Sequence, residues 1–207
     1  MTVIGTAGPR RVLNVGGGNK KIPIPPHYAG WSHVLLDINP ALAPDVVCDA
    51  RQLDTLPGNQ YDAIYCSHNL EHYYRHDTQS VLRGFLHVLK PDGFAEIRVP
   101  DLRAVMERVV RHNLELDAIL YQSNAGPISV LDVIYGLASE IEESGSDFQQ
   151  HKAGFTPQSL GRTLETAGFA AIFLFASPDA YECRALAFRG APTLYHQQLL
   201  KLPTLPR

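Results

Sequence analysis

Three glycines and two aspartates stand directly after short apolar runs, where they could bind a nucleoside-containing ligand. Residues 11–15 lead into the glycines at 16–18, which let a ligand approach the backbone closely because they carry no Cβ atom. Asp37 ends the next run about 20 residues further on, where a carboxylate can accept hydrogen bonds from both hydroxyls of a ribose. Asp49 follows the third run, where its carboxylate or the next backbone amide could contact an adenine amino group. These positions together predict a nucleoside-binding site.

Histidines supply the side chains that could remove a proton from an acceptor, because an imidazole is the usual base near neutral pH. His68 follows the fourth apolar run, residues 61–66, and therefore stands at a strand end that faces the ligand. His151 follows a long mixed segment, where a lid over the substrate is expected. We predict that His151 is the substrate-side base and that His68 is a second catalytic candidate. His72, four residues after His68 and one turn away on a helix, is a further candidate.

A repeat of histidines every four residues, at His68, His72 and His76, raises the question of a metal site on one helix face. No cysteine lies close to them in the sequence, and a helical arrangement turns Glu71 away from that face. The sequence therefore predicts no metal.

Short apolar runs that end on glycine or acidic residues predict the parallel strands of an α/β sheet, whose ligands bind beyond the carboxyl ends of the strands. The helical spacing of residues 77–90 places a helix between the fourth and fifth runs. A second helix is expected from Thr156 to Thr166, with Thr156 as its cap. The predicted strands are 11–15, 33–37, 45–48, 61–66, 93–99, 170–176 and 183–189.

The segment between the fifth and sixth predicted strands shows helical spacing over 102–121 and again from about 127 to 143. We therefore predict a helical lid insert over residues 102–150. Residues 191–207 contain three prolines and are expected to form an exposed C-terminal tail. The rest, residues 1–190, is expected to form a single domain.

The composition is typical of one globular domain and disfavours a protein whose main role is to bind nucleic acid. The 207 residues are 45% hydrophobic, enough for one substantial core without disulfides. The net charge of −3 contrasts with the strongly basic balance typical of nucleic-acid-binding proteins. The three cysteines form no CxxC pair, and the sequence has neither a signal region nor an apolar stretch of membrane-spanning length. We expect a cytoplasmic protein without a membrane span.

The glycine turn, the two aspartates and the segments around them form one ordered set of motifs. These are Asn14-Val15-Gly16-Gly17-Gly18, Leu36-Asp37, Cys48-Asp49-Ala50, residues 61–72 and residues 88–93. In this order they resemble class I S-adenosylmethionine-dependent methyltransferases, most of all a compact bacterial subgroup associated with glycan or lipid modification. The resemblance implies a Rossmann-like, doubly wound α/β fold with seven mostly parallel strands, and S-adenosyl-L-methionine as the cofactor.

The resemblance also implies a role for each strand end. The glycine turn would line the methionine part of the cofactor, Asp37 would bind the ribose, and Asp49 with Ala50 would meet the adenine. Asn14 stands where the family usually has an acid, a change expected to lower the affinity for the cofactor. The implied cofactor-binding residues are Asn14, Gly16, Gly17, Gly18, Asp37, Asp49, Ala50, Ser67 and His68.

The predicted function is methyl transfer from S-adenosylmethionine to an oxygen of a small-molecule or glycan- or lipid-linked acceptor. Nucleic acid is not expected as a partner, and the sequence sets no oligomeric state. One alternative is a non-catalytic, cofactor-binding partner or regulatory protein of the same fold, which the departure at Asn14 favours. A second alternative is an NAD-dependent oxidoreductase, against which the incomplete glycine fingerprint and the segment Ser67-His68-Asn69 argue.

Overall fold

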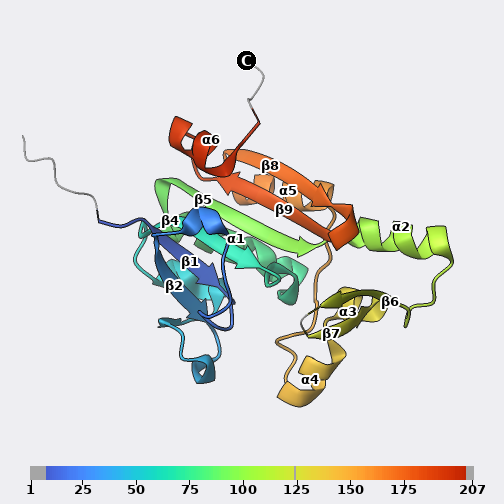
Figure 1. Ribbon diagram of the computed structural model, residues 1–207. Coiled ribbons are helices and arrows are strands. Elements are labelled where there is room, and N and C mark those ends of the chain that lie inside the picture. The colour runs from blue at the N-terminus through green and yellow to red at the C-terminus, as the bar shows by residue number, and fades with distance from the viewer. Residues whose placement is uncertain (1–7, 124, 204–207) are drawn as a thin grey trace, which may run out of the picture.

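The computed structural model describes residues 8–123 and 125–203, and a seven-stranded sheet in the order β3-β2-β1-β4-β5-β9-β8 forms its centre (Figure 1). Every strand pair in this sheet is parallel except the two that β9 forms with β5 and β8. The predicted Rossmann-like, doubly wound and mostly parallel sheet is therefore confirmed. The strands are β1 (Arg11–Val15), β2 (Ser32–Asp37), β3 (Val46–Val47), β4 (Tyr61–Ser67), β5 (Leu89–Pro100), β8 (Ala171–Ser177) and β9 (Glu182–Phe188).

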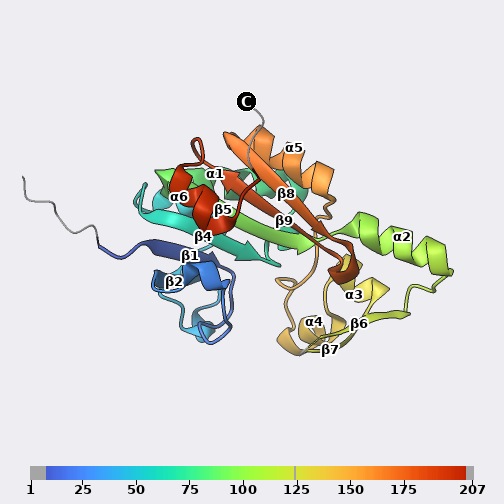
Figure 2. The same ribbon diagram turned by 45° about the horizontal axis from the view of Figure 1, so that its top comes forward.

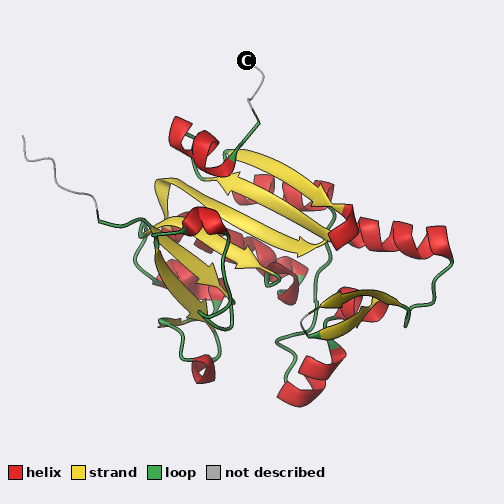
Figure 3. Ribbon diagram, in the orientation of Figure 1, coloured by secondary structure: helices red, strands yellow, loops and turns green. Residues whose placement is uncertain are grey.

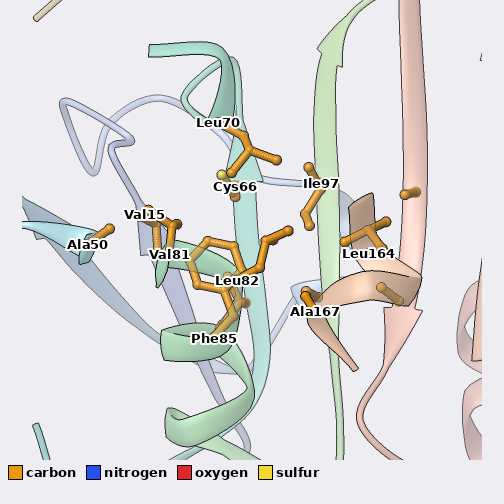
Figure 4. Packing of buried hydrophobic residues seen from close by; sticks show 14 of the residues in the cluster. Val15, Ala50, Cys66, Leu70, Val81, Leu82, Phe85, Ile97, Leu164 and Ala167 are labelled. Atoms are coloured by element: carbon orange, nitrogen blue, oxygen red, sulfur yellow. The ribbon is translucent and has the colours of Figure 1, made fainter. Parts of the chain in front are cut away.

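Helical segments cover both faces of the sheet, because its inner strands are apolar on both sides (Figures 1 and 2). On one face, Phe85 and Leu164 are fully buried in the same cluster as Ile97 of β5 (Figure 4). On the other face, Phe94 and Phe188 are buried together with Leu200. The helices of the first face are α1 (Arg75–Val88) and α5 (Pro157–Ala167), and those of the second are the 3-10 helix η1 (Pro26–Tyr28) and α6 (Leu194–Leu200).

The insert after β5 differs from the expected pair of long helices, because a two-stranded sheet occupies its middle (Figure 3). Asn113 adopts a left-handed conformation, with φ of 47°, and ends the first helix well before residue 121. Gly136, with φ of 97°, separates two short helices where one continuous helix over 127–143 was expected. Both expectations were wrong in these parts. The elements are α2 (Leu102–His112), β6 (Ile119–Ser123), β7 (Gly126–Ser129), α3 (Val130–Tyr135) and α4 (Ala138–Ser144).

The two ends of the insert meet at Asp101. Its side chain caps α2 by accepting a hydrogen bond from the amide of Arg103 at 3.0 Å. Asp101 also forms an isolated parallel bridge with Phe155, and the amide of Leu102 donates to the carbonyl of Phe155 at 2.9 Å. The chain therefore leaves the sheet and returns to it at one place.

The C-terminal segment packs on the sheet, so the expectation of an exposed tail over 191–207 was wrong where this segment is described. Thr193 and His196 form a capping box at the start of α6, and the His196 ring packs against Phe94 and Phe188. Leu200 closes the same apolar cluster. Residues 204–207 lie outside the described part, and the domain boundary at residue 190 stays a prediction. No described helix is both long and apolar enough to cross a membrane.

A buried charge lies under the second face. Glu96 of β5 is 0% exposed, and its carboxylate is 2.9 Å from His27 Nε2 and 2.9 Å from Arg98 Nη2. The hydroxyl of Tyr28 donates a hydrogen bond to it at 3.2 Å. Burial acts to raise the pKa of Glu96, but His27 and Arg98 outweigh burial and hold the pKa below its usual value. Glu96 therefore joins η1 to the sheet as an ion.

We predict that Glu96→Gln lowers the free energy of unfolding at pH 7 by about 3 kcal/mol, because it removes the buried charge that the partly buried Arg98 faces. Because the folded-state pKa of Glu96 is depressed, its contribution is complete above the unfolded value and is lost as the pH falls below about 4. Denaturant unfolding at pH 7 and in the acid range measures both effects. Glu165→Gln, on an exposed position of α5, is the control and should leave stability unchanged. Equal stability of the Glu96→Gln variant and the wild-type protein would contradict this account.

Candidate functional site

A cavity of about 320 Å³ lies beyond the carboxyl ends of β1, β2 and β4. Parallel strands open their carboxyl ends at one edge of the sheet, and the change of direction between β1 and β4 leaves a crevice there. Residues of the insert close the opposite side, among them Asp147 and Phe148. Its sheet-side wall includes Gly16, Gly18, Asp37, Asp49 and His68.

The turn after β1 requires glycine for two separate reasons. Gly16 and Gly18 have φ of 66° and 63°, the left-handed region that favours glycine. A Cβ atom on Gly16 would collide with the side chain of Asn69, and one on Gly17 would collide with that of Asn14. The amide of Gly16 donates to the carbonyl of Leu36 at 2.8 Å, which fixes the turn against β2. The turn therefore presents bare backbone to the cavity.

Asn14 lies beneath this turn, outside the cavity wall. Its side chain is 3% exposed, and Nδ2 donates a hydrogen bond to Nε2 of His33 at 3.2 Å. Its Oδ1 is buried without a hydrogen-bond partner among the described residues. Asn14 therefore supports Gly17 from below and offers one free acceptor at the base of the turn.

Asp37 and Asp49 stand at the two positions where a nucleoside would lie. Oδ1 of Asp37, at the end of β2, accepts a hydrogen bond from the amide of Asn39 at 2.9 Å. Asp49 caps the 3-10 helix η3 (Ala50–Thr55), accepting from the amide of Arg51 at 2.9 Å and from its guanidinium at 2.6 Å. Burial acts to raise the pKa of Asp49, but the bonds from Arg51 lower it overall. Asp49 is therefore an anion held in place.

His68 follows β4 with φ of 49° and lines the cavity. Its Nε2 is 3.2 Å from a carboxylate oxygen of Glu182, and its Nδ1 is 3.5 Å from one of Glu71. Burial acts to lower the pKa of His68, but the two carboxylates outweigh it and raise the pKa to about 9. His68 therefore keeps its proton at neutral pH and acts as a hydrogen-bond donor, a state that disfavours a role as base.

His151 does not line this cavity and lies behind its wall. Its Nδ1 donates a hydrogen bond to the carbonyl of Val133 at 2.9 Å, and its ring packs against that of His72, with centroids 5.1 Å apart. Burial lowers the pKa of His151, so the ring is neutral at pH 7. His72 lines the cavity itself, whereas His151 lines a shallower depression of about 350 Å³ between α3 and α4. The two rings thus form the partition between the two hollows.

The structure divides the predicted site residues into two groups. Those on the cavity wall are Gly16, Gly18, Asp37, Asp49 and His68. Those behind the wall are Asn14, Gly17, Ala50, Ser67 and His151. Ala50 is only 1% exposed and belongs to the apolar core.

Two features of the site were missed by the sequence reasoning. Glu71 is 1% exposed and points inward, because the segment after β4 is a 3-10 turn, η4 (Leu70–His72), in place of the α-helix assumed for the histidine spacing. Phe148 enters the cavity wall from the insert, and its neighbours in the sequence gave no sign of this. His76, in contrast, is exposed on α1 and contacts only its neighbours Tyr74 and Asp77.

The glycine turn and the two aspartates at one cavity agree with a comparison against protein families. A family described as "Methyltransferase domain" matches residues 5–173, which is most of the chain. The chain belongs to this family. Together with the fold and the cavity, this membership makes the protein an S-adenosylmethionine-dependent methyltransferase of class I. The NAD-dependent alternative is thereby set aside.

Solved structures with the same fold include several methyltransferases. A "SAM dependent methyltransferase" from Archaeoglobus fulgidus is 17% identical, with 87% of this chain and 86% of that chain covered and a TM-score of 0.52. A 1,6-didemethyltoxoflavin-N1-methyltransferase from Burkholderia thailandensis, with bound S-adenosylhomocysteine, is 16% identical, with coverages of 88% and 72% and a TM-score of 0.50. The CMeT domain of citrinin polyketide synthase is 16% identical, with coverages of 89% and 47% and a TM-score of 0.55.

These likenesses concern the fold alone, because the identities are low. The chain spans about half the length of the citrinin polyketide synthase structure. A comparison with curated protein sequences found no significant match. The acceptor therefore has to be argued from the residues of the site.

We predict that Gly16→Ala weakens the binding of S-adenosylhomocysteine at least about tenfold, which corresponds to about 1.4 kcal/mol. The added Cβ meets Asn69 and displaces the turn that lines the cavity. Calorimetric titration measures the affinity. Gly30→Ala is the matched control, because Gly30 also has a positive φ, of 80°, but open space around its Cβ position. If Gly16→Ala bound S-adenosylhomocysteine as tightly as Gly30→Ala, the turn at Gly16 would not shape the binding site.

Proposed function

We propose that the protein transfers the methyl group of S-adenosylmethionine to an oxygen atom of a small-molecule or glycan- or lipid-linked acceptor. The observation that carries the choice of oxygen is the neutral His151 at the partition of the two hollows. No hydrogen bond reaches its Nε2 among the described residues, so a lone pair is free there to act on a hydroxyl group. Hydroxyl acceptors need such a group, whereas more acidic acceptors do not.

The cofactor fits the sheet-side half of the cavity. Bare backbone at 16–18 leaves room for its amino-acid part, and Asp37 and Asp49 stand at successive strand ends for its ribose and adenine. The unpartnered Oδ1 of Asn14 marks a polar position at the base of the turn. When bound, S-adenosylmethionine supplies a methyl group already activated on a positively charged sulfur, so the protein has to align the acceptor and exclude water.

The acceptor half of the site is formed by the insert and the histidines. His68 lines the cavity while its ring nitrogens face Glu182 and Glu71, and we assign the activation of the acceptor oxygen to His151. Asp147 lines the same cavity but is 3.1 Å from the ammonium group of Lys152, which balances its charge. A neutral, hydroxyl-rich acceptor fits this wall better than a strongly charged one, and neither nucleic acid nor a membrane lipid surface is needed.

We also propose a cytoplasmic location. Cys48, Cys66 and Cys183 are all unpaired, which suits a reducing compartment.

We predict that a panel of hydroxylated sugars, phenols and glycolipid headgroups contains an acceptor, detected by release of S-adenosylhomocysteine and a mass gain of one methylene in the product. His151→Ala should lower kcat with that acceptor by about 100-fold or more, because an acid–base group contributes about that factor. His76→Ala, which changes an exposed histidine on α1, is the matched control and should keep full activity. Cofactor binding with no turnover on any acceptor would favour the non-catalytic alternative, and turnover on amines alone would contradict O-methylation.

A second prediction concerns the ribose. Asp37→Asn should weaken S-adenosylhomocysteine binding between about tenfold and a hundredfold, since a hydrogen bond to a charged acceptor contributes about 1.5–3 kcal/mol. Calorimetric titration gives the affinity. Asp54→Asn, at an exposed aspartate of η3, is the control. An unchanged affinity in the Asp37→Asn variant would place the ribose elsewhere.

A further inference from the structure

We propose that Glu71, His72 and His151 bind one divalent first-row transition-metal ion at the partition between the cofactor cavity and the depression. One carboxylate oxygen and two imidazole nitrogens of these residues lie within 4.8 Å of one another. Metal–nitrogen distances of about 2.0–2.1 Å place tetrahedral ligands about 3.4 Å apart, so small side-chain rotations bring the three atoms onto one ion.

Glu71 carries the strongest indication. Its carboxylate is buried, and neither oxygen has a hydrogen-bond partner among the described residues. The nearest cationic group is the His68 ring, 3.5 Å away. Burying a carboxylate is costly, and the other deeply buried glutamate among the described residues, Glu96, is surrounded by His27, Arg98 and Tyr28, whereas Glu71 has the longer contact with His68. A metal cation would give Glu71 a second positive partner.

His151 is already oriented as a ligand. Its Nδ1–H donates to the carbonyl of Val133, which fixes the tautomer and leaves the lone pair on Nε2. Histidines that bind metals in proteins almost always donate their other ring nitrogen to a carbonyl or carboxylate in this way.

His72 brings a second imidazole to the site, and each of its ring nitrogens faces a backbone carbonyl oxygen. Its Nδ1 is 3.1 Å from the carbonyl oxygen of Gln150, and its Nε2 is 3.1 Å from that of His68. A ring nitrogen binds a metal through its lone pair, so one of these two carbonyl contacts has to open for His72 to become a ligand.

Backbone hydrogen bonds hold the three residues together across 80 positions of sequence. The amides of Lys152 and Ala153 donate to the carbonyl of Glu71, at 2.8 and 3.0 Å. The amide of His151 donates to the carbonyl of Tyr135 at 3.0 Å. The ligands are therefore positioned before any ion binds.

The donor set indicates which metals fit. Two imidazoles and one carboxylate, with further coordination positions open, suit Zn²⁺, Fe²⁺, Co²⁺ or Mn²⁺ better than Mg²⁺, which prefers oxygen ligands. The open side faces the place where we put the acceptor, and there a bound metal would lower the pKa of a coordinated hydroxyl group, whose proton would pass to solvent water. This consequence rests on the proposed function: with an ion bound, the Nε2 lone pair of His151 would hold the metal, and the metal would take over the activation that His151 performs alone without it.

Metal binding to the whole chain, freed of metal by dialysis against EDTA, tests the proposal without cofactor or acceptor. Titration with Co²⁺ should give visible d–d absorption that saturates at one ion per chain, and Zn²⁺ should displace it and raise the Tm. Glu71→Gln and His151→Ala should each weaken Zn²⁺ binding by about 100-fold or more, since even the loss of a residue that only orients a ligand costs about 10–100-fold. His76→Ala should bind as wild type.

The thermal stability of Glu71→Gln shows whether its loss of metal binding could come from misfolding. The metal-free Glu71→Gln variant should have a Tm close to that of metal-free wild type, because the loss of the contact with His68 is offset by the loss of a buried charge, yet Zn²⁺ should no longer raise it. A wild-type protein that binds no Co²⁺ or Zn²⁺ stoichiometrically overturns the proposal, as does binding that survives both Glu71→Gln and His151→Ala. If the EDTA-treated, metal-free enzyme methylates a hydroxyl acceptor at full rate, the proposed role of the metal in activating the acceptor fails while the proposed function stands.

Discussion

The parallel register of β1 with β2 on one side and β4 on the other is the constraint on which the site depends. It pairs Val15 with Leu36 and with Cys66, so that three chain segments leave the sheet at one level. The glycine turn, Asp37 and His68 then face one cavity although they come from distant parts of the sequence. A slip of one residue in either pairing would turn the alternating side chains to the opposite faces and separate these groups.

The sheet-side half of the site could be predicted because its signals are local. Each apolar run and the glycine or aspartate that ends it, such as residues 11–15 with Gly16, stand together in the sequence, and parallel sheets always bind ligands at that end. The insert-side half could not be predicted in this way. Helical spacing over 127–143 gave no sign of the break at Gly136, and the inward turn of Glu71 depends on the left-handed backbone of His68.

The proline content of the C-terminal segment led to a wrong prediction. The prolines of residues 191–207 suggested an exposed tail, yet Thr193 and His196 carry a capping box, and Leu200 completes an apolar cluster. The sheet has a second apolar face, and something in the chain has to cover it. Tyr28 and α6 do so together, and the ionised Glu96 lies beneath them, so charge and apolar packing act on the same layer.

The meeting of both insert ends at Asp101 has a consequence for how such a protein changes over evolution. Because residues 101 and 155 are bridged, the segment between them leaves and rejoins the sheet at one place, and its length can vary without moving β1, β2 and β4. Residues of this segment close one side of the cavity, so insertions or substitutions there can reshape that side while the strand ends on the opposite side stay in place.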